Sequence, residues 1–349
     1  MQFLKVVSCC LIILFAKFSM MFSQNTLPRD SGTILFESEK CLELTLSLDL
    51  DSLYKGGFAE QNRYHGSIRC LNNDSNVCII PVYFTKRGHF RRRFNVCDFP
   101  PLRIHFHAKS IAGTPFEALR KIKMVTHCQN NDTNFNQYVI QEYLFYKVYN
   151  IITDHSFKVR LAKIKYIDLS GNYADMEKYA FFLENPEHLA QRLHGVNLDI
   201  HELYPQAVDP YYYSLMSLFE YIIVNQDWSI ELLHNVELIG IYPSLAPVTV
   251  PFDFDVSWLI NIPYNHPTIS YRLGKKIERK FLPAKVNRKA MMMAILKLRE
   301  KREEILNLYH HTNLLNENNK LKTLTSLEAF FQLLENKKWV HKEFIKNRH

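Results

Sequence analysis

Residues 219–258, FEYIIVNQDWSIELLHNVELIGIYPSLAPVTVPFDFDVSW, carry the pattern from which the rest of the chain can be interpreted. An apolar helix is predicted to end at Val224. Two short strands are predicted over 236–241 and 247–250, because the turn-forming Tyr242-Pro243-Ser244 separates two apolar runs. The polar side chains of interest for chemistry in this stretch are Asn225, Asp227, His234, Asn235, Asp253 and Asp255.

Side chains with amide or carboxylate oxygens precede and follow this predicted hairpin. Magnesium prefers carboxylate and amide oxygens and keeps several of its waters. If the hairpin folds back, Asn235 with Asp253 or Asp255 could supply such oxygens. The alternative is that the two aspartates are ordinary turn carboxylates that follow a strand.

The composition indicates a folded globular protein. Of 349 residues, 47% are hydrophobic and 22% charged, which is enough apolar material for one large domain or two smaller ones. The net charge of +8 is dispersed and accompanies no recognised nucleic-acid motif, so no nucleic-acid partner is expected. An exported protein that meets anionic envelopes also gains from a mild positive charge.

The N-terminus is typical of a secretory signal peptide. Lys5 precedes a mainly apolar run to Phe22, and small and polar residues follow at Ser23-Gln24-Asn25. Cleavage near Ser23 would export the chain to the periplasm, the cell envelope or the medium. An uncleaved signal anchor is the alternative, and it is the one route to a membrane that the sequence suggests.

Five of the seven cysteines lie beyond the predicted signal, all in the first half of the chain. In an oxidising compartment they favour disulfides, with one cysteine left over. Cys70 and Cys78 flank a turn-rich loop, so a bridge across that hairpin is the first expectation. Cys97 with Cys128 is the second, which leaves Cys41 free.

Residues 24–96 are predicted to be rich in β-structure. The segment Leu42–Leu50 alternates apolar and polar residues, as a half-buried strand does. A basic loop, Arg87–Arg93, interrupts the pattern and contains Gly88. Its backbone could approach an anion, or it could be a surface hairpin tip.

From residue 97 the pattern becomes mixed α/β. A strand is predicted over 119–126 with Lys123, and a helix over 138–151 with Glu142. Further strands are expected over 160–167 and 179–183. The last of these is followed by Glu184-Asn185-Pro186 and a helix, and the tail from about residue 262 is predicted to be helical.

These residues together resemble the spore-coat-protein-H (CotH) kinase family, a secreted branch with the protein-kinase-like fold, and are most similar to its uncharacterised exported bacterial members. The resemblance covers about residues 80–260. The matching pieces are Arg87-Gly88, Cys97-Asp98-Phe99-Pro100-Pro101-Leu102, Lys123–Cys128, Glu142–Tyr146, Phe182-Leu183-Glu184, Asn225-Gln226-Asp227-Trp228-Ser229, His234-Asn235 and Pro251–Asp255.

The resemblance implies an α+β fold with two lobes, a β-rich N-terminal region and a helical C-terminal region. It also implies ATP and Mg²⁺ as cofactors. Asp227 would be the catalytic-loop aspartate, and Asn235, Asp253 and Asp255 would hold the metal. The nucleotide would be bound by Arg87, Gly88, Arg103, Lys123, Glu142 and the segment around Glu184.

The chain departs from the kinase pattern in four ways. Asn225-Gln226 stand where His-Arg would precede the aspartate, and Asn235 follows Asp227 by eight residues rather than five. Asp255 replaces the glycine of the DFG motif, and no Gly-x-Gly-x-x-Gly loop is present. The departures favour nucleotide binding more strongly than phosphoryl transfer to protein.

Three functions therefore remain open. The first is a secreted CotH-like kinase that transfers phosphate from ATP to a protein or cell-envelope acceptor. The second is a catalytically degenerate kinase-like scaffold of the envelope. The third is a secreted structural or adhesive protein that works through its β-rich region. The expected organisation is a signal at 1–23, a β-rich region at 24–96 and a kinase-like region at 97–349.

Overall fold

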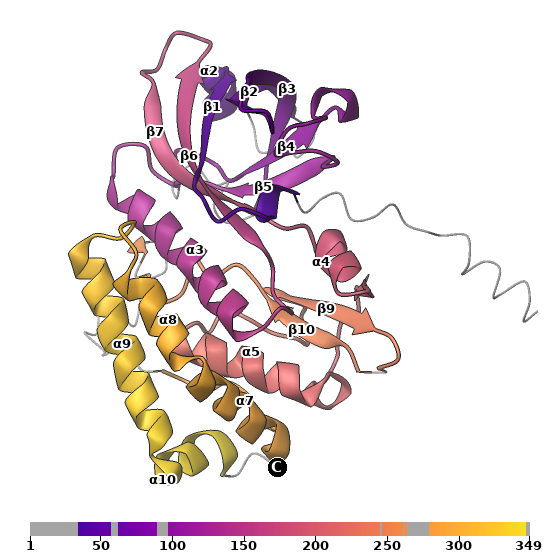
Figure 1. The fold of residues 1–349 in the computed structure, drawn as a ribbon, viewed down its shortest axis with the longest axis vertical. Helices are drawn as coiled ribbons and strands as arrows, with labels where there is room; N and C mark the ends of the chain where they lie inside the picture. The colour runs from indigo at the N-terminus through magenta and orange to yellow at the C-terminus, as the bar shows by residue number, and fades with distance from the viewer. Residues whose placement is uncertain are drawn as a thin grey trace, which may run out of the picture.

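The computed structural model describes residues 34–56, 62–88, 97–244, 246–260, 262–263 and 279–346. The predicted signal peptide and the basic loop beyond Gly88 lie outside these ranges. The predicted α+β class is confirmed: strands dominate the N-terminal region and helices the C-terminal region (Figure 1). In the part of the chain that is described, no helix is both long and apolar enough to cross a membrane.

Seven strands close into a barrel in the order β1-β2-β3-β4-β5-β7-β6. Neighbouring strands are antiparallel except for β1 and β6, which close the barrel as a parallel pair with Leu42 opposite Ala162. The strands are β1 (Leu42–Leu48), β2 (Tyr64–Leu71), β3 (Val77–Lys86), β4 (Leu102–Phe106), β5 (Lys121–Val125), β6 (Val159–Asp168) and β7 (Met176–Leu183). The β-rich part therefore extends to Leu183, beyond the range 24–96 expected from the sequence.

The barrel core follows from the period of two along each strand. Leu46 and Leu48 of β1 are fully buried, as are Ile104 of β4 and Met124 of β5, while the residues between them face outward. The alternation in the sequence thus specifies which face of β1 and β4 turns inward.

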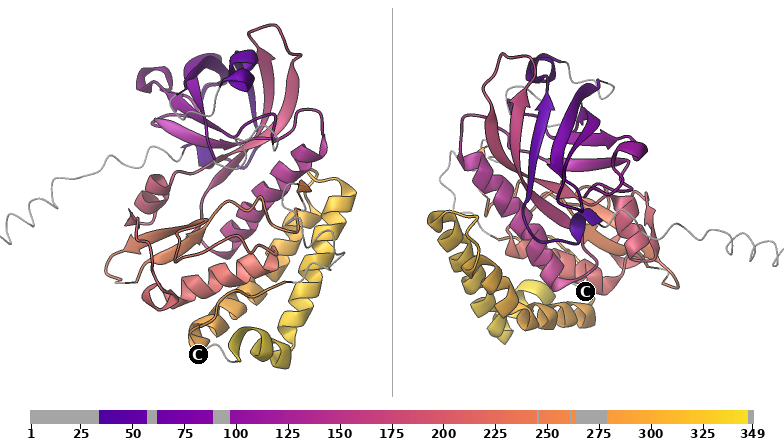
Figure 2. Two further views of the ribbon diagram at one scale, coloured as in Figure 1. Left: turned by 180° about the vertical axis from the view of Figure 1, so that it is seen from behind. Right: turned by 45° about the horizontal axis from the view of Figure 1, so that its top comes forward.

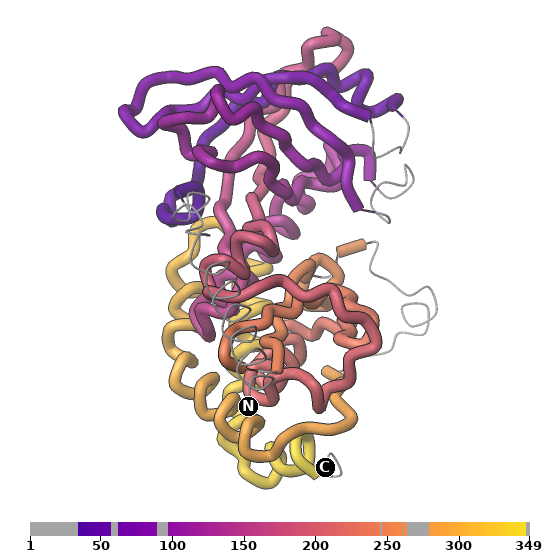
Figure 3. The backbone as a smooth tube through the Cα atoms, turned by 90° about the vertical axis from the view of Figure 1, so that its right-hand side faces the viewer, coloured from indigo at the N-terminus to yellow at the C-terminus, as the bar shows by residue number. Residues whose placement is uncertain are grey.

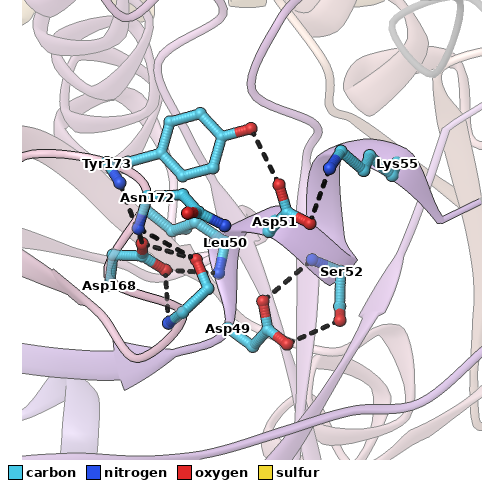
Figure 4. Close-up of polar contacts among 9 residues, drawn as sticks. Asp49, Leu50, Asp51, Ser52, Lys55, Asp168, Asn172 and Tyr173 are labelled. Carbon is cyan, nitrogen blue, oxygen red and sulfur yellow. Dashed lines mark hydrogen bonds and ion pairs between the residues drawn. The ribbon is translucent and has the colours of Figure 1, made fainter.

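A turn cluster fastens the short helix α2 (Leu50–Lys55) to the end of the β6–β7 hairpin (Figure 4). The Asp168 carboxylate accepts hydrogen bonds from the backbone N–H of Leu50 at 2.9 Å and of Asn172 at 2.8 Å. It also accepts from the backbone N–H groups of Ser170 and Tyr173 and from the Ser170 hydroxyl. The sequence analysis did not predict α2, because six residues are too few to show helical periodicity.

Helix α3 (Asn134–Ile152) runs from the barrel into the helical region, and the three views agree on this (Figures 1 and 2). It is buried on most sides, since it packs against both β6 and β7 and against α8. The remaining helices are α4 (Pro186–Arg192), α5 (Pro210–Ile222), α7 (Arg288–Glu300), α8 (Arg302–His310), α9 (Glu317–Glu335) and α10 (Lys337–Val340), followed by a π-helical turn at His341–Ile345.

A second sheet of order β10-β9-β8 lies on the side of the helical region that faces the barrel (Figure 3). Its strands are β8 (Gly195–Leu198), β9 (Val236–Ile241) and β10 (Val248–Pro251). The hairpin β9–β10 matches the predicted pair of strands, whereas β8 was not predicted. Helix α5 packs against β10, so this sheet and α5 together support the stretch 219–258.

One disulfide, Cys97–Cys128, joins the segment before β4 to the segment after β5. This pairing was the second expectation and is present. The first expectation, a Cys70–Cys78 bridge, is not formed: the two sulfurs lie 3.0 Å apart on directly opposed residues of β2 and β3, and both cysteines are free. Cys41 is free and exposed, as expected.

Candidate functional site

The loop that carries Asp227 is shaped by its own polar groups. Helix α5 ends at Ile222, and Val224 then takes a left-handed conformation with φ 58°, which turns the chain sharply. The Asn225 side chain accepts a hydrogen bond from the backbone N–H of Asp227 at 3.1 Å. A two-stranded bridge between Ser229 and His234 closes the loop, so Asp227 and His234 emerge side by side.

The Asp227 carboxylate is held from two directions. One oxygen lies 2.9 Å from Nε2 of His234, and the other accepts a hydrogen bond from Nδ2 of Asn235 at 3.1 Å. The same Asn235 nitrogen donates to the backbone carbonyl of Asp227 at 2.7 Å. Asn235 is buried, but about half of the Asp227 side chain is exposed (48%), so a substrate can reach its carboxylate.

Asn235 also connects this loop to the second aspartate motif. Its backbone carbonyl accepts a hydrogen bond from the N–H of Phe252 at 3.0 Å, and Asp253 follows directly. Asp253 has φ 62°, and its N–H donates to the hydroxyl of Tyr146 on α3 at 2.8 Å. Burial, reinforced by the charges of Glu142 and Asp253, holds the pKa of Tyr146 well above its usual value, so this hydroxyl stays neutral.

Lys123 on β5 faces this assembly from the barrel. Burial is the main cause that lowers its pKa. The positive charges of Arg87 and Arg103 lower it further, and the negative charges of Glu237 and Asp253 raise it. Its ammonium lies 5.3 Å from the centre of the Phe252 ring. Lys123 is therefore influenced by two further cations of the barrel and by two carboxylates of the helical region.

Glu142 on α3 and Asp255 after β10 lie close together. Both are buried, and they line a small cavity of about 10 Å³ together with Thr126 and Tyr138. This volume is close to that of one water molecule. Glu142 thus lies beside the end of the β10 segment.

Glu184, which was predicted to lie in a nucleotide-binding segment, makes contacts within the protein that stabilise the fold. Its carboxylate is buried, pairs with Arg192 at 2.9 Å and accepts from the backbone N–H of Lys158 at 2.9 Å. The side chain therefore stabilises the connection between β7 and α4. At the opposite end of the site, Gly88 is exposed with φ 75°, and the Arg87 N–H donates to the carbonyl of Pro101 at 2.9 Å.

Three residues of this site had no assigned role in the sequence analysis. Tyr146 lies one helical turn after Glu142, and that spacing was the available signal. Glu237 stands between two buried residues on β9 and is itself half-buried. The contact of His234 with Asp227 spans seven residues of loop, for which no periodic pattern exists.

The donor set of this cluster suits a hard cation. Because Nδ2 of Asn235 is engaged with Asp227, its Oδ1 is the atom that would face a metal, and Asp253 and Asp255 add carboxylates. No group of three or more His, Cys, Asp or Glu side chains with metal-binding spacing occurs within the described residues. The set fits Mg²⁺, which is commonly held by one or two carboxylates plus the phosphates of its substrate.

The fold and the cluster define an α+β protein whose polar groups gather where a β-barrel meets a helical region. The sequence matches no protein-family model and no curated protein. Among solved structures, it is similar to the proinflammatory kinase CtkA of Helicobacter pylori, with 11% identity and a TM-score of 0.36, over 71% of this chain and 92% of that one. Values this low carry no inference about the ligands or activity of the present chain.

Proposed function

We propose that this protein is an ATP- and Mg²⁺-dependent phosphotransferase that acts outside the cytoplasm on a protein or cell-envelope acceptor. The observation that carries the proposal is the hydrogen-bonded chain from Asp227 through Asn235 to the Phe252-Asp253 segment. A half-exposed carboxylate, a buried amide and a second carboxylate are the residue types that such chemistry uses, in the order that it uses them.

In this proposal the barrel supplies the phosphate contacts. Arg87, Arg103 and Lys123 are charged donors near the nucleotide, and the Glu184–Pro186 connection lies beside the base. Mg²⁺, held by Asn235, Asp253 and Asp255, would neutralise the charge on the transferring phosphoryl group.

Asp227 would accept the proton of the acceptor hydroxyl. The acceptor oxygen forms a bond to the γ-phosphorus as the bond from that phosphorus to the β–γ bridging oxygen breaks, and ADP leaves. His234 contacts the Asp227 carboxylate oxygen that Asn235 does not bind, and it would fix the orientation of that carboxylate.

A second candidate is a kinase-like binding or scaffold protein without catalysis. Both oxygens of Asp227 already accept hydrogen bonds, one each from His234 and Asn235, which leaves less capacity for a proton. For either candidate, the Cys97–Cys128 disulfide and the predicted signal peptide support an extracytoplasmic location.

Thermal unfolding with and without Mg²⁺ and ATP tests the nucleotide site. A ligand at 100 times its dissociation constant stabilises the folded state by about 2.7 kcal/mol. Asp253→Asn should abolish the shift, because asparagine tolerates the positive φ at this position but lacks the charge. Asp175→Asn, in the β6–β7 hairpin, is the matched control and should keep the shift.

Phosphate transfer separates the two candidates. Asp227→Asn should keep the stabilisation by Mg²⁺ and ATP but lose transfer to an acceptor. Stabilisation in the wild-type protein without any transfer to envelope fractions would favour the scaffold. No stabilisation at millimolar ATP would reject the phosphotransferase and leave the binding or scaffold protein.

A further inference from the structure

The outer face of the barrel carries a second set of positive charges, separate from Lys123 and its neighbours. An open groove of about 590 Å³ runs along the ends of β3, β4 and β5. We name it the basic groove; its polar and aromatic lining residues are Tyr83, His105, Phe106, His107, Lys109, Arg120 and Lys121.

The cations of the basic groove have no acidic partners. None of its lining residues is acidic, and Lys109, Arg120 and Lys121 form no ion pair within the described residues. By contrast, cations on β6 of the same barrel are neutralised, Lys163 by Glu177 at 2.6 Å and Lys165 by Asp175 at 3.2 Å. The positive charges of Lys109, Arg120 and Lys121 are therefore not neutralised by any described acidic side chain.

Two stacked rings give the groove a fixed floor. Tyr83 and His105, opposite each other on β3 and β4, stack with centroids 4.4 Å apart and planes 7° apart. The imidazole of His105 also bonds the Thr85 hydroxyl at 3.0 Å. The Arg63 guanidinium lies 4.9 Å from the Tyr83 centroid, so the phenol ring contacts both an imidazole and a cation.

This arrangement discriminates between two kinds of anionic partner. Proteins that bind single-stranded nucleic acid offer open aromatic faces on which bases stack. The Tyr83 ring is already stacked on His105 and contacted by the Arg63 guanidinium. Carboxylates need cations and N–H donors rather than ring faces, and the basic groove supplies these.

The basic groove adjoins the candidate phosphotransfer site. Lys121 and Lys123 lie two residues apart on β5, so they share one face at a separation of about 7 Å along the strand. The Lys121 carbonyl accepts a hydrogen bond from Asn185, in the β7–α4 connection, at 2.9 Å. A chain bound in the groove would thus reach the edge of the site.

We propose that the basic groove binds an acidic segment of the acceptor protein and presents its neighbouring hydroxyl group to Asp227. This inference rests on the proposed function, which it deepens by naming the acceptor class. His105 provides a reporter inside the groove: burial first, and then the charges of Arg103, Lys121 and Arg63, lower its pKa to about 4. Bound carboxylates would raise this pKa, since a nearby negative charge favours the protonated imidazole.

Binding is measured with the full chain and no nucleotide or metal. The probes are a fluorescent peptide of alternating aspartate and serine, its asparagine counterpart, and an oligothymidylate. The aspartate peptide should bind, more weakly as salt increases, and should raise the pKa of His105 by NMR titration. Lys109→Ala with Lys121→Ala should weaken binding by about fivefold to tenfold. The matched control, Lys163→Ala with Lys165→Ala, removes the same charge from β6 and should not.

Three results would overturn the proposal: no peptide binding, equal weakening in the β6 control, or tighter binding of oligothymidylate than of the aspartate peptide. These outcomes are independent of the nucleotide site. If Mg²⁺ and ATP stabilise the protein but the peptide does not bind, the phosphotransfer proposal stands and the basic groove proposal fails.

Discussion

The side-chain amide of Asn235 donates hydrogen bonds to both the backbone carbonyl and the carboxylate of Asp227, at 2.7 and 3.1 Å. Eight residues separate the pair, and the intervening loop closes on the Ser229–His234 bridge. The side-chain amide of Asn235 can therefore reach Asp227 across a spacing of eight residues, because the residues between them form that closed loop.

Replacing Asn235 should separate side-chain from backbone effects. Asn235→Ala removes two hydrogen bonds from a buried position and should lower the free energy of unfolding by about 2 kcal/mol. Asn235→Gly loses the same bonds but relieves the cost of φ 55°, so it should be about 1 kcal/mol more stable than the alanine variant. Urea unfolding of both variants measures the difference, and equal stabilities would contradict a backbone contribution.

Glu220 on α5 is expected to be protonated at neutral pH. Its carboxyl group is buried beside the Asn225 side chain, and its pKa is raised well above its usual value, chiefly by burial. The folded protein thus holds a proton that the unfolded chain releases above about pH 4.3, so stability falls as pH rises above that value.

Glu220→Gln mimics the neutral carboxyl and should remove this decline with little other effect. Glu220→Ala should be less stable at all pH values because it leaves a cavity beside Asn225 and Tyr149. Urea unfolding across the pH range provides the comparison. A decline of the same slope in the glutamine variant would show that another group causes it.

Asp168 should have the opposite pH dependence. Burial alone would raise its pKa, but hydrogen bonds from the Ser170 side chain and from the backbone N–H groups of Leu50, Ser170 and Tyr173 together lower it below its usual range. Its contribution is therefore present above about pH 3.9 and is lost as pH falls through the lowered native pKa.

Asp168→Ala should destabilise the protein by about 1–2 kcal/mol near neutral pH and flatten the acid limb of its stability curve. It should also release α2, because the Leu50 contact is lost (Figure 4). Hydrogen exchange of the α2 amides measures this release. Unchanged protection in α2 would contradict the role assigned to the turn.

The Cys97–Cys128 disulfide spans 31 residues of sequence. Loop-closure entropy predicts that removing it costs about 3–4 kcal/mol. Cys97→Ser with Cys128→Ser should lower the midpoint of urea unfolding accordingly, whereas Cys41→Ser, at an exposed free thiol, should not. Thiol titration of the unfolded wild-type chain should find both members of the Cys70–Cys78 pair reactive.

Local patterns were sufficient to predict most of the strands and helices. Alternating leucines identified β1, and the apolar runs around Tyr242-Pro243-Ser244 identified the β9–β10 hairpin. Short elements such as α2 and β8 were missed because they span too few residues for a period to appear. Within the tail predicted to be helical, α7 and α8 are separated at Lys301, where the backbone leaves the helical conformation.

Local sequence patterns predicted less of the candidate site than of the fold. The sequence supplies Asp227, Asn235 and Asp253 within a single hairpin, so their proximity could be anticipated. Local patterns did not indicate that Lys123 and Asp253, which are 130 positions apart, would lie close together. They also did not indicate the hydrogen bond that the Asp253 N–H donates to the Tyr146 hydroxyl. The roles assigned to these residues remain predictions for the experiments above.

The sequence by itself determined the α+β class, the inward face of β1 and β4 and the order of polar residues along the chain, because side-chain periodicity is a local property of the backbone. Only the tertiary structure decided that β1 closes the barrel against β6, that Cys97 rather than Cys70 forms the bridge, and that Glu184 binds Arg192. These pairings depend on which distant surfaces bury each other, and the free energy of that burial belongs to the whole fold rather than to any segment of it.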